Sequence, residues 1–458
     1  MHIRRYDRNY SRRHFLDQVR KGVLATGVLM PAWQAIAKDG DASKAYPEEL
    51  LSIEAYTKGK ISVGDEVTAE NVDVVRDLLD DIKYKQIKTM GRKLKVGKTT
   101  NDIYKLSPWE YIEATLSNQG KAQFDDRGNV VTAEGEPWIG GNPFPDPKTG
   151  IELFAGLTMN WGRHDASQYA IREYDLSPEG EVQYQYDLVW AEFQTVARTT
   201  MEPKPYWTKH KDKLRFQSVV FTAPNDISGT SFLNIWDYDQ HTFPDLYGYL
   251  PNFKRIREYP SSQRFEPLIP GGTLYLSDAW AAGDPMYTWG NYKIVDRGPL
   301  LVGMSDGWNP DHPNWEHPTH GGPKDQTFWD TTVELIPEAI AVDAEPTSYP
   351  RAPIGKKRVW FDARTGLPVA MNSYDRKGQV YRSFDGAYAQ YEKNGQKVMD
   401  GKHPYWSWGH VHAYDIQTGR MSRLEQVKEV SGGYQMAVND PDMYRKFLTK
   451  TALRRLGS

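Results

Sequence analysis

Residues 182–193 read VQYQYDLVWAEF and carry the clearest secondary-structure signal in the chain. Bulky side chains recur at every second position along this stretch, at Tyr184, Tyr186, Leu188 and Trp190. Successive side chains of a β-strand point to opposite faces of its sheet, so these four residues share one face. The pattern therefore predicts a strand with one bulky, largely aromatic face.

Further strand-like runs follow along the chain, with turn residues between them. No helix of crossover length separates these runs, which favours antiparallel over parallel pairing. They predict one large antiparallel sheet or an open barrel. Two earlier runs, at 111–116 and 122–131, are also strand-like. The later runs lie at 214–222, 231–238, 246–250, 287–295, 357–362, 367–374 and 379–391.

Two long irregular stretches, 255–286 and 303–350, interrupt the predicted sheet and are rich in Pro and Gly. Loops of this length are usually functional, often as covers over a site. Helical spacing predicts a helix that begins at Thr68 and continues to Ile82, and a closing helix over 440–456. No composition break marks a domain boundary, so we expect residues 38–458 to form a single domain.

The composition excludes several classes of site. The 458 residues contain no cysteine, which rules out disulfides, iron–sulfur clusters, thiolate zinc sites and a cysteine nucleophile. The 57 basic and 60 acidic residues nearly balance, which gives no sign of a nucleic-acid partner. The 28 Tyr and 15 Trp suit either half-buried strands or an aromatic-lined cavity, and composition alone does not choose between them.

Residues 1–37 have the features of an export signal. Arg12 and Arg13 lie in a twin-arginine-like SRRHFL motif, an apolar run follows over 22–33, and 35–37 supply a small-x-small cleavage motif. The apolar run is shorter than the roughly 20 residues that a membrane-spanning helix needs. We therefore expect a twin-arginine-type signal, cleaved near Ala37, and a periplasmic mature protein. An amphipathic helix of the mature fold is the alternative.

The segment DLYGYLP at 245–251, followed by KRIR at 254–257, resembles a recognisable family signature. It is similar to the strand–loop–basic segment of the outer-membrane lipoprotein-sorting-like (LolA/LolB-like) superfamily. Within that superfamily, the chain resembles a large uncharacterised proteobacterial periplasmic family. Other segments agree with it in order: 61–68, 143–152, 287–295, 357–362, 374–378 and 452–457.

The resemblance implies a mainly β (α+β) fold, in which a large curved antiparallel sheet forms an open half-barrel around a helical plug. Relatives hold acyl chains or other lipids on the apolar concave face. Members of this family are often associated with efflux-type transporters of the resistance–nodulation–division class. The family has no accepted catalytic residues, so we expect a carrier or accessory protein for a hydrophobic ligand, without a cofactor, rather than an enzyme.

Aromatic residues of the predicted strands and loops are candidates to line the concave face. Aromatic side chains suit such a surface because they bury a large apolar area with few polar demands. Filling the core between sheet and helix is the alternative role. The candidates are Trp236, Tyr247, Tyr249, Trp280 and Trp289.

Lys254, Arg255 and Arg257 form a compact basic group after the signature strand. Their charges suit an anionic head group or the acidic surface of a partner protein. They equally suit a solvated sheet edge that discourages strand-to-strand aggregation.

Five histidines support an alternative function. His410 and His412 form an H-x-H pair, and on a strand both imidazoles point the same way, as metal ligands require. A carboxylate from Asp311 or Glu316 would complete a site with an open position. This reading predicts a metal-dependent periplasmic enzyme or accessory factor in a catabolic pathway. The remaining histidines of the group are His312, His317 and His320.

Overall fold

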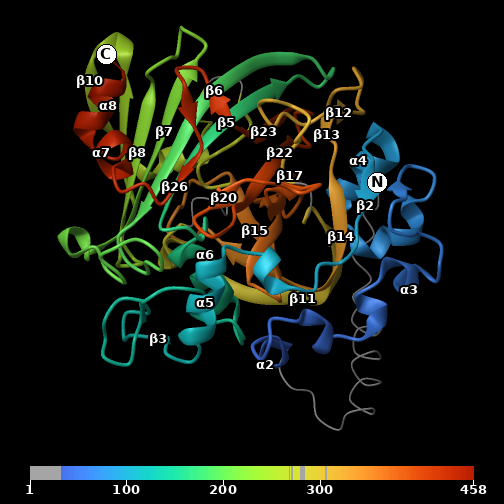
Figure 1. The fold of residues 1–458 in the computed structure, drawn as a ribbon. Coiled ribbons are helices and arrows are strands. Elements are labelled where there is room, and N and C mark those ends of the chain that lie inside the picture. Colours follow the sequence, from blue (N-terminus) through green and yellow to red (C-terminus); the bar gives the residue numbers. More distant parts are fainter. Residues whose placement is uncertain (1–31, 268, 270–271, 279–283, 305–306, 458) are drawn as a thin grey trace.

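The computed structural model describes residues 32–457 apart from 268, 270–271, 279–283 and 305–306 (Figure 1). It is mainly β-structure, dominated by one sheet of 16 strands. Most of the predicted export signal, 1–31, lies outside the described residues. The end of that segment forms the short helix α2 (Ala32–Ile36), in which Trp33 and Ile36 are buried in a small apolar cluster.

The sheet is curved and does not close into a barrel, because its terminal strands β1 and β10 do not pair. Its pairs are antiparallel except that β2 runs parallel to β14. The strand β11 (Gly290–Val302) also pairs with β14, and β26 (Ala437–Val438) with β5. The order is β1 (Glu66–Val67), β2 (Leu94–Val96), β14 (Thr332–Glu345), β15 (Ile354–Asp362), β16 (Leu367–Asp375), β17 (Val380–Gln390), β22 (Trp406–Asp415), β23 (Met421–Val427), β5 (Ala166–Leu176), β6 (Val182–Gln194), β7 (Lys213–Ala223), β8 (Ser231–Asp237), β9 (Asp245–Leu250) and β10 (Arg255–Tyr259).

Small two-stranded sheets lie outside this large sheet. They pair β3 (Gln123–Phe124) with β4 (Val130–Val131), β12 (Thr319–His320) with β13 (Phe328–Trp329), β18 (Glu392–Lys393) with β19 (Gln396–Lys397), β20 (Met399–Asp400) with β21 (His403–Pro404), and β24 (Glu429–Val430) with β25 (Tyr434–Gln435).

Strand β6 separates two apolar layers. Leu188 and Trp190 belong to the main core on the concave face, whereas Val189 and Ala191 pack in a second core on the convex face. The alternation predicted for 182–193 is therefore confirmed. Tyr184, near the start of the strand, remains 44% exposed.

Helix α6 (Gly150–Met159) lies in the hollow of the sheet and corresponds to the expected helical plug (Figure 1). It begins with a capping box, in which Thr149 and Glu152 satisfy each other's backbone N–H groups. Its apolar side chains Leu153, Phe154 and Leu157 join the main core of the concave face.

On the convex face, α7 (Met443–Phe447) and α8 (Lys450–Leu456) cover β6 and β8–β10 (Figure 1). The sequence predicted one helix over 440–456. The break arises because the Thr449 hydroxyl accepts the N–H of Ala452 and starts a new helix.

Three sequence predictions fail in the first and third quarters of the chain. Residues 111–116 lie in helix α5 (Trp109–Ser117), where Tyr111, Ile112 and Thr115 are buried at helical spacing. The helix expected from Thr68 is a 3₁₀ segment (Val72–Leu78) followed by α4 (Asp81–Met90), which Asp80 caps by accepting the N–H groups of Ile82 and Lys83. The stretch 303–350 contains the long strand β14 in its second half.

Candidate functional site

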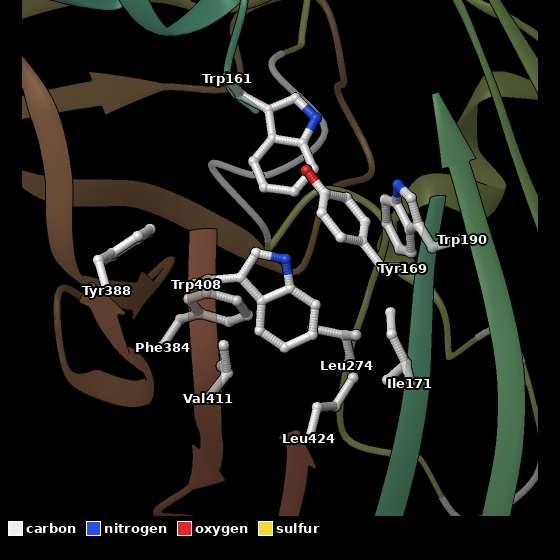
Figure 2. Close-up of a pocket in the computed structure, with 10 residues that line it drawn as sticks. All are labelled: Trp161, Tyr169, Ile171, Trp190, Leu274, Phe384, Tyr388, Trp408, Val411 and Leu424. Carbon is white, nitrogen blue, oxygen red and sulfur yellow. The ribbon is translucent and has the colours of Figure 1, made fainter. Parts of the chain in front are cut away.

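An apolar cavity of about 50 Å³ opens on the concave face (Figure 2). Five neighbouring strands, β17, β22, β23, β5 and β6, supply most of its wall, and two connecting segments supply the rest. It is lined by Trp161, Tyr169, Ile171, Trp190, Leu274, Phe384, Tyr388, Trp408, Val411 and Leu424.

The aromatic walls of this cavity meet edge to face. The rings of Trp161 and Trp190 lie 6.4 Å apart at 76°, and those of Tyr169 and Trp408 lie 5.7 Å apart at 64°. Such arrangements are favoured by the ring quadrupoles and hold the rings in place.

A buried carboxyl group holds two of these rings by hydrogen bonds. Oε1 of Glu192 accepts hydrogen bonds from Nε1 of Trp161, at 2.5 Å, and from Nε1 of Trp190, at 2.9 Å. Burial raises the pKa of Glu192 to about 7, against the opposing charge of Arg215. The indole N–H groups of both rings are thereby satisfied.

A second, smaller cavity of about 20 Å³ adjoins the first, since Trp190, Leu274 and Leu424 line both. Its wall includes one carboxyl group, that of Glu173 on β5. Glu173 is 5% exposed, and its pKa is raised well above the usual value by burial and by the negative charge of Asp175.

Residues 272–278, which we call the covering segment, lie over these cavities. Leu274 lines both of them and Gly272 lines the smaller. Polar contacts tether the segment to the sheet. The N–H of Thr273 donates to Oγ of Ser422 at 2.8 Å, and its hydroxyl donates to the carbonyl of Ala413 at 3.0 Å. A buried ion pair joins Asp278 to Arg382.

The aromatic residues predicted to bind a ligand do not line this cavity. Trp236 is fully buried beside the guanidinium of Arg215, 4.6 Å from its ring. Trp289 lies in the main core, where its indole N–H donates to Asp284 at 2.9 Å. Trp280 lies outside the described residues.

Tyr247 and Tyr249 pack on the convex side of β9, against the C-terminal helices. Nζ of Lys450 in α8 lies 3.5 Å from the ring centroid of Tyr247. Their neighbour Leu246 instead joins the concave core. The sequence predicted that the two tyrosines share a face, and this is confirmed, but that face is the convex one.

The basic group lies at one edge of the sheet. Lys254 adopts a left-handed turn with φ of 48° between β9 and β10, and Arg255 and Arg257 are exposed on β10, the terminal strand. The guanidinium of Arg257 stacks 5.0 Å from the ring of Phe253, which is 56% exposed. Both roles expected for these residues remain predictions.

Three of the five histidines come together on the convex face. Ring centroids of His317 and His410 lie 4.8 Å apart, and those of His410 and His412 lie 5.8 Å apart. Two of their ring nitrogens make structural contacts: Nε2 of His412 accepts the N–H of Trp329 and Nε2 of His410 contacts the hydroxyl of Thr331, both at 2.9 Å. Burial lowers the pKa of both His410 and His412.

The other two histidines lie apart from these, in the loop and hairpin before β14. His312 pairs with Glu316 at 3.2 Å, and His320 pairs with Asp330 at 2.6 Å. Within the described part of the chain, no group of three or more His, Asp or Glu side chains is arranged to hold a metal ion. The metal reading therefore gains no support from these residues.

Several cavity residues were not singled out from the sequence, although the signal for some was present. Tyr169 and Ile171 alternate along β5, the same period-two pattern that identified β6. Phe384 and Tyr388 lie within the predicted strand 379–391. Their proximity to Trp408 comes from the pairing of β17 with β22, which the sequence does not encode locally.

Residues 66–454 match the model of one protein family, described as DUF1329, a protein of unknown function. The chain belongs to the DUF1329 family. This match confirms the family resemblance drawn from the segment around 245–257. Among the described residues of this family member, no helix is long and apolar enough to cross a membrane.

Solved structures show a distant likeness to this DUF1329 chain. A DUF1329 family protein from Desulfovibrio piger is 14% identical, with 66% of this chain and 97% of that chain covered and a TM-score of 0.43. A domain from Vibrio parahaemolyticus named for outer membrane lipoprotein sorting is 16% identical, with coverage of 67% and 97% and a TM-score of 0.42. A LolA superfamily protein from Nitrosomonas europaea is 12% identical, with coverage of 67% and 100% and a TM-score of 0.36. A comparison with curated proteins found no match.

Proposed function

We propose that this chain is a periplasmic carrier or accessory protein that holds a hydrophobic or lipid-like molecule against its concave face. One observation carries the proposal: the larger cavity is lined by aliphatic and aromatic side chains and lies beneath a tethered covering segment. Transfer of apolar surface from water into such a cavity contributes about 25 cal/mol per Å² buried.

The cavity volume sets a condition on this function. At about 50 Å³ it is smaller than the roughly 300–1,000 Å³ of pockets that enclose drug-sized ligands. A lipid chain therefore enters only if the covering segment moves away from the sheet. Movement of the whole segment breaks the contacts of Thr273 with Ser422 and Ala413 and the ion pair of Asp278 with Arg382.

The partner and location form a second part of the proposal, supported by the family resemblance and the leader-like residues 1–37. In this view residues 38–458 act as one exported domain that serves an efflux-type transporter of the resistance–nodulation–division class. The exposed Lys254, Arg255 and Arg257 are its contact with the transporter or an anionic head group. Glutamate at all three positions should abolish capture of the transporter, and undiminished capture would exclude this surface.

A cavity-filling variant tests the ligand site itself. Val411→Phe places a ring in the larger cavity, whereas Val182→Phe adds the same ring at a position that is 38% exposed. We expect Val411→Phe to lose binding of the fluorescent apolar probe N-phenyl-1-naphthylamine, while Val182→Phe binds it like the wild type. Circular dichroism confirms that each variant folds. Equal probe binding by wild type and Val411→Phe would place the ligand elsewhere.

A further inference from the structure

Two buried carboxyl groups stand beside the apolar cavities, and neither forms an ion pair with a described residue. Glu173 is 5% exposed and lines the smaller cavity, and Asp175, two residues along β5, is fully buried. Both lie on the face of β5 that also carries Tyr169 and Ile171. Burying a carboxylate is costly unless something compensates it, so the pair needs an explanation.

The described residues around these carboxyl groups provide only some of the hydrogen bonds that the carboxyl oxygens can accept. Oδ1 of Asp175 accepts the hydroxyl proton of Ser422, but Oδ2 of Asp175 has no hydrogen-bond partner among the described residues. Burial raises the pKa of Asp175 to about 6, although Ser422 and the charge of Arg420 oppose the shift. The carboxyl of Glu173 faces a space large enough for one water-sized group.

We propose that the two cavities form a site for a hydrophobic primary amine, with its ammonium group in the smaller cavity beside Glu173 and its apolar part in the larger one. This inference rests on the proposed function and names the class of ligand. An ammonium group is about the size of a water molecule and offers three donors to the two carboxyl groups. The ring of Trp190 lines both cavities and offers a cation–π surface to the ammonium group, while the rings of Trp408 and Tyr169 supply apolar contact in the larger cavity.

Charge distinguishes an amine from other amphipathic ligands at this site. A fatty acid would bring a further carboxylate close to Asp175, whose pKa of about 6 leaves it ionised at pH 7, and like charges at short range repel. An alcohol can hydrogen bond to Glu173 but gains nothing from the negative charge of the carboxyl pair. A charge-assisted hydrogen bond between ammonium and carboxylate is roughly twice as strong as a neutral one.

The protonation states give this proposal a distinctive signature. In the empty site, burial and the negative charge of Asp175 raise the pKa of Glu173 well above its usual value. Other polar groups that face the pair are Tyr186 on β6, Ser422 on β23 and Arg420 beside it. A bound ammonium ion favours the ionised carboxylate, so binding should release a proton.

Isothermal titration calorimetry with octylamine, 1-octanol and octanoate tests this at pH 7. We expect octylamine to bind about tenfold or more tightly than 1-octanol, with octanoate the weakest. The heat of octylamine binding should differ between phosphate and Tris buffers, because these take up the released proton with different enthalpies. The heat for 1-octanol should be the same in both.

Glu173→Gln keeps the shape of a protonated glutamate but cannot ionise. We expect it to remove the advantage of octylamine and the buffer dependence while leaving 1-octanol binding unchanged. Glu179→Gln, at an exposed position in the β5–β6 turn, should behave like the wild type. If Glu173→Gln does not fold by circular dichroism, Asp175→Asn takes its place and should weaken octylamine binding alone.

The outcomes separate this inference from the proposed function. If none of the three probes binds, the proposed hydrophobic site itself fails, and the inference fails with it. If 1-octanol binds as tightly as octylamine, or Glu173→Gln binds octylamine like the wild type, the carrier function stands and the amine inference is overturned.

Discussion

Glu192 accepts a hydrogen bond from the indole N–H of Trp190, two residues before it on β6, over 2.9 Å from Nε1 to Oε1. The same oxygen accepts the indole N–H of Trp161. One carboxyl group thus fixes two walls of the cavity. These two rings can line an apolar cavity without leaving a buried N–H unsatisfied, because Glu192 accepts both indole N–H groups.

Removal of this carboxyl group should destabilise the chain and loosen the cavity. Glu192→Ala leaves two buried indole N–H groups without their acceptor, at roughly 1–3 kcal/mol each. We expect urea unfolding to show that the free energy of unfolding falls by about 2–4 kcal/mol. An exposed substitution such as Glu179→Ala should change it much less. A loss below about 0.5 kcal/mol would show that other acceptors replace Glu192.

The buried Glu425 should make stability depend on pH. Burial raises its pKa to about 8, although it accepts the N–H of His317 at 2.8 Å. The folded pKa exceeds the unfolded value of about 4.3. The contribution of Glu425 to the free energy of unfolding is therefore fully present below about pH 4.3 and is lost as the pH rises to about 8.

Glu425→Gln isolates this effect, since glutamine has nearly the shape of the protonated acid. We expect the variant to gain about 3–5 kcal/mol of unfolding free energy relative to the wild type between pH 4 and pH 9. Urea unfolding of both proteins at the two pH values measures the change. If the free energies of unfolding of the two proteins differ by the same amount at both pH values, Glu425 has an ordinary pKa in the folded chain.

A buried ion triad joins the N-terminal region to the sheet. The carboxylate of Asp385 on β17 lies 2.9 Å from Nζ of Lys83 and 2.6 Å from a guanidinium nitrogen of Arg92. These two cations hold the pKa of Asp385 well below its usual range despite burial. Its contribution is therefore present at neutral pH and is lost only as the pH falls through that lowered value.

Asp385→Ala would leave two buried cations without their anion. We expect the free energy of unfolding, measured with urea at pH 7, to fall by about 3–5 kcal/mol. Asp73→Ala removes an exposed partner of Lys88 and serves as the matched control, with little expected change. Equal stability of the two variants would argue that the triad is solvated rather than buried.

The covering segment should release ligand faster when its tether is cut. The hydroxyl of Thr273 donates to the carbonyl of Ala413 and accepts the N–H of Ser422 at 2.9 Å. Thr273→Val removes both contacts at nearly constant volume, and at about 1 kcal/mol each the release rate should rise roughly tenfold or more. Stopped-flow release of N-phenyl-1-naphthylamine measures this rate. An unchanged rate would show that the segment does not control exchange.

Local sequence pattern predicted much of the sheet but less of the site. The strands β6–β9 and β15–β17 follow from alternation and turn residues, and each occurs close to its expected place. Alternation tells which residues share a face but not which face is concave. The sequence therefore predicts Tyr247 and Tyr249 as cavity residues, whereas both pack in the convex core against the C-terminal helices.

The remaining site residues depend on long-range pairing. The cavity forms because β23 pairs with β5, bringing Leu424 beside Ile171 across some 250 residues of sequence. The segment 111–116 is a different case, because there the predicted type of secondary structure is wrong. Its apolar residues fit a short strand, but Pro108 starts a helix there and the burial of Ile112 and Thr115 follows helical spacing.

Native mass spectrometry of the protein, purified from its own cells under non-denaturing conditions, tests the central claim most directly. The claim predicts a population that carries a small hydrophobic molecule, and displacement of that molecule by octylamine or 1-octanol. The Val411→Phe variant should emerge without it, because the added ring fills the larger cavity. A wild-type protein that emerges empty, and gains no thermal stability from either probe, would contradict the carrier function.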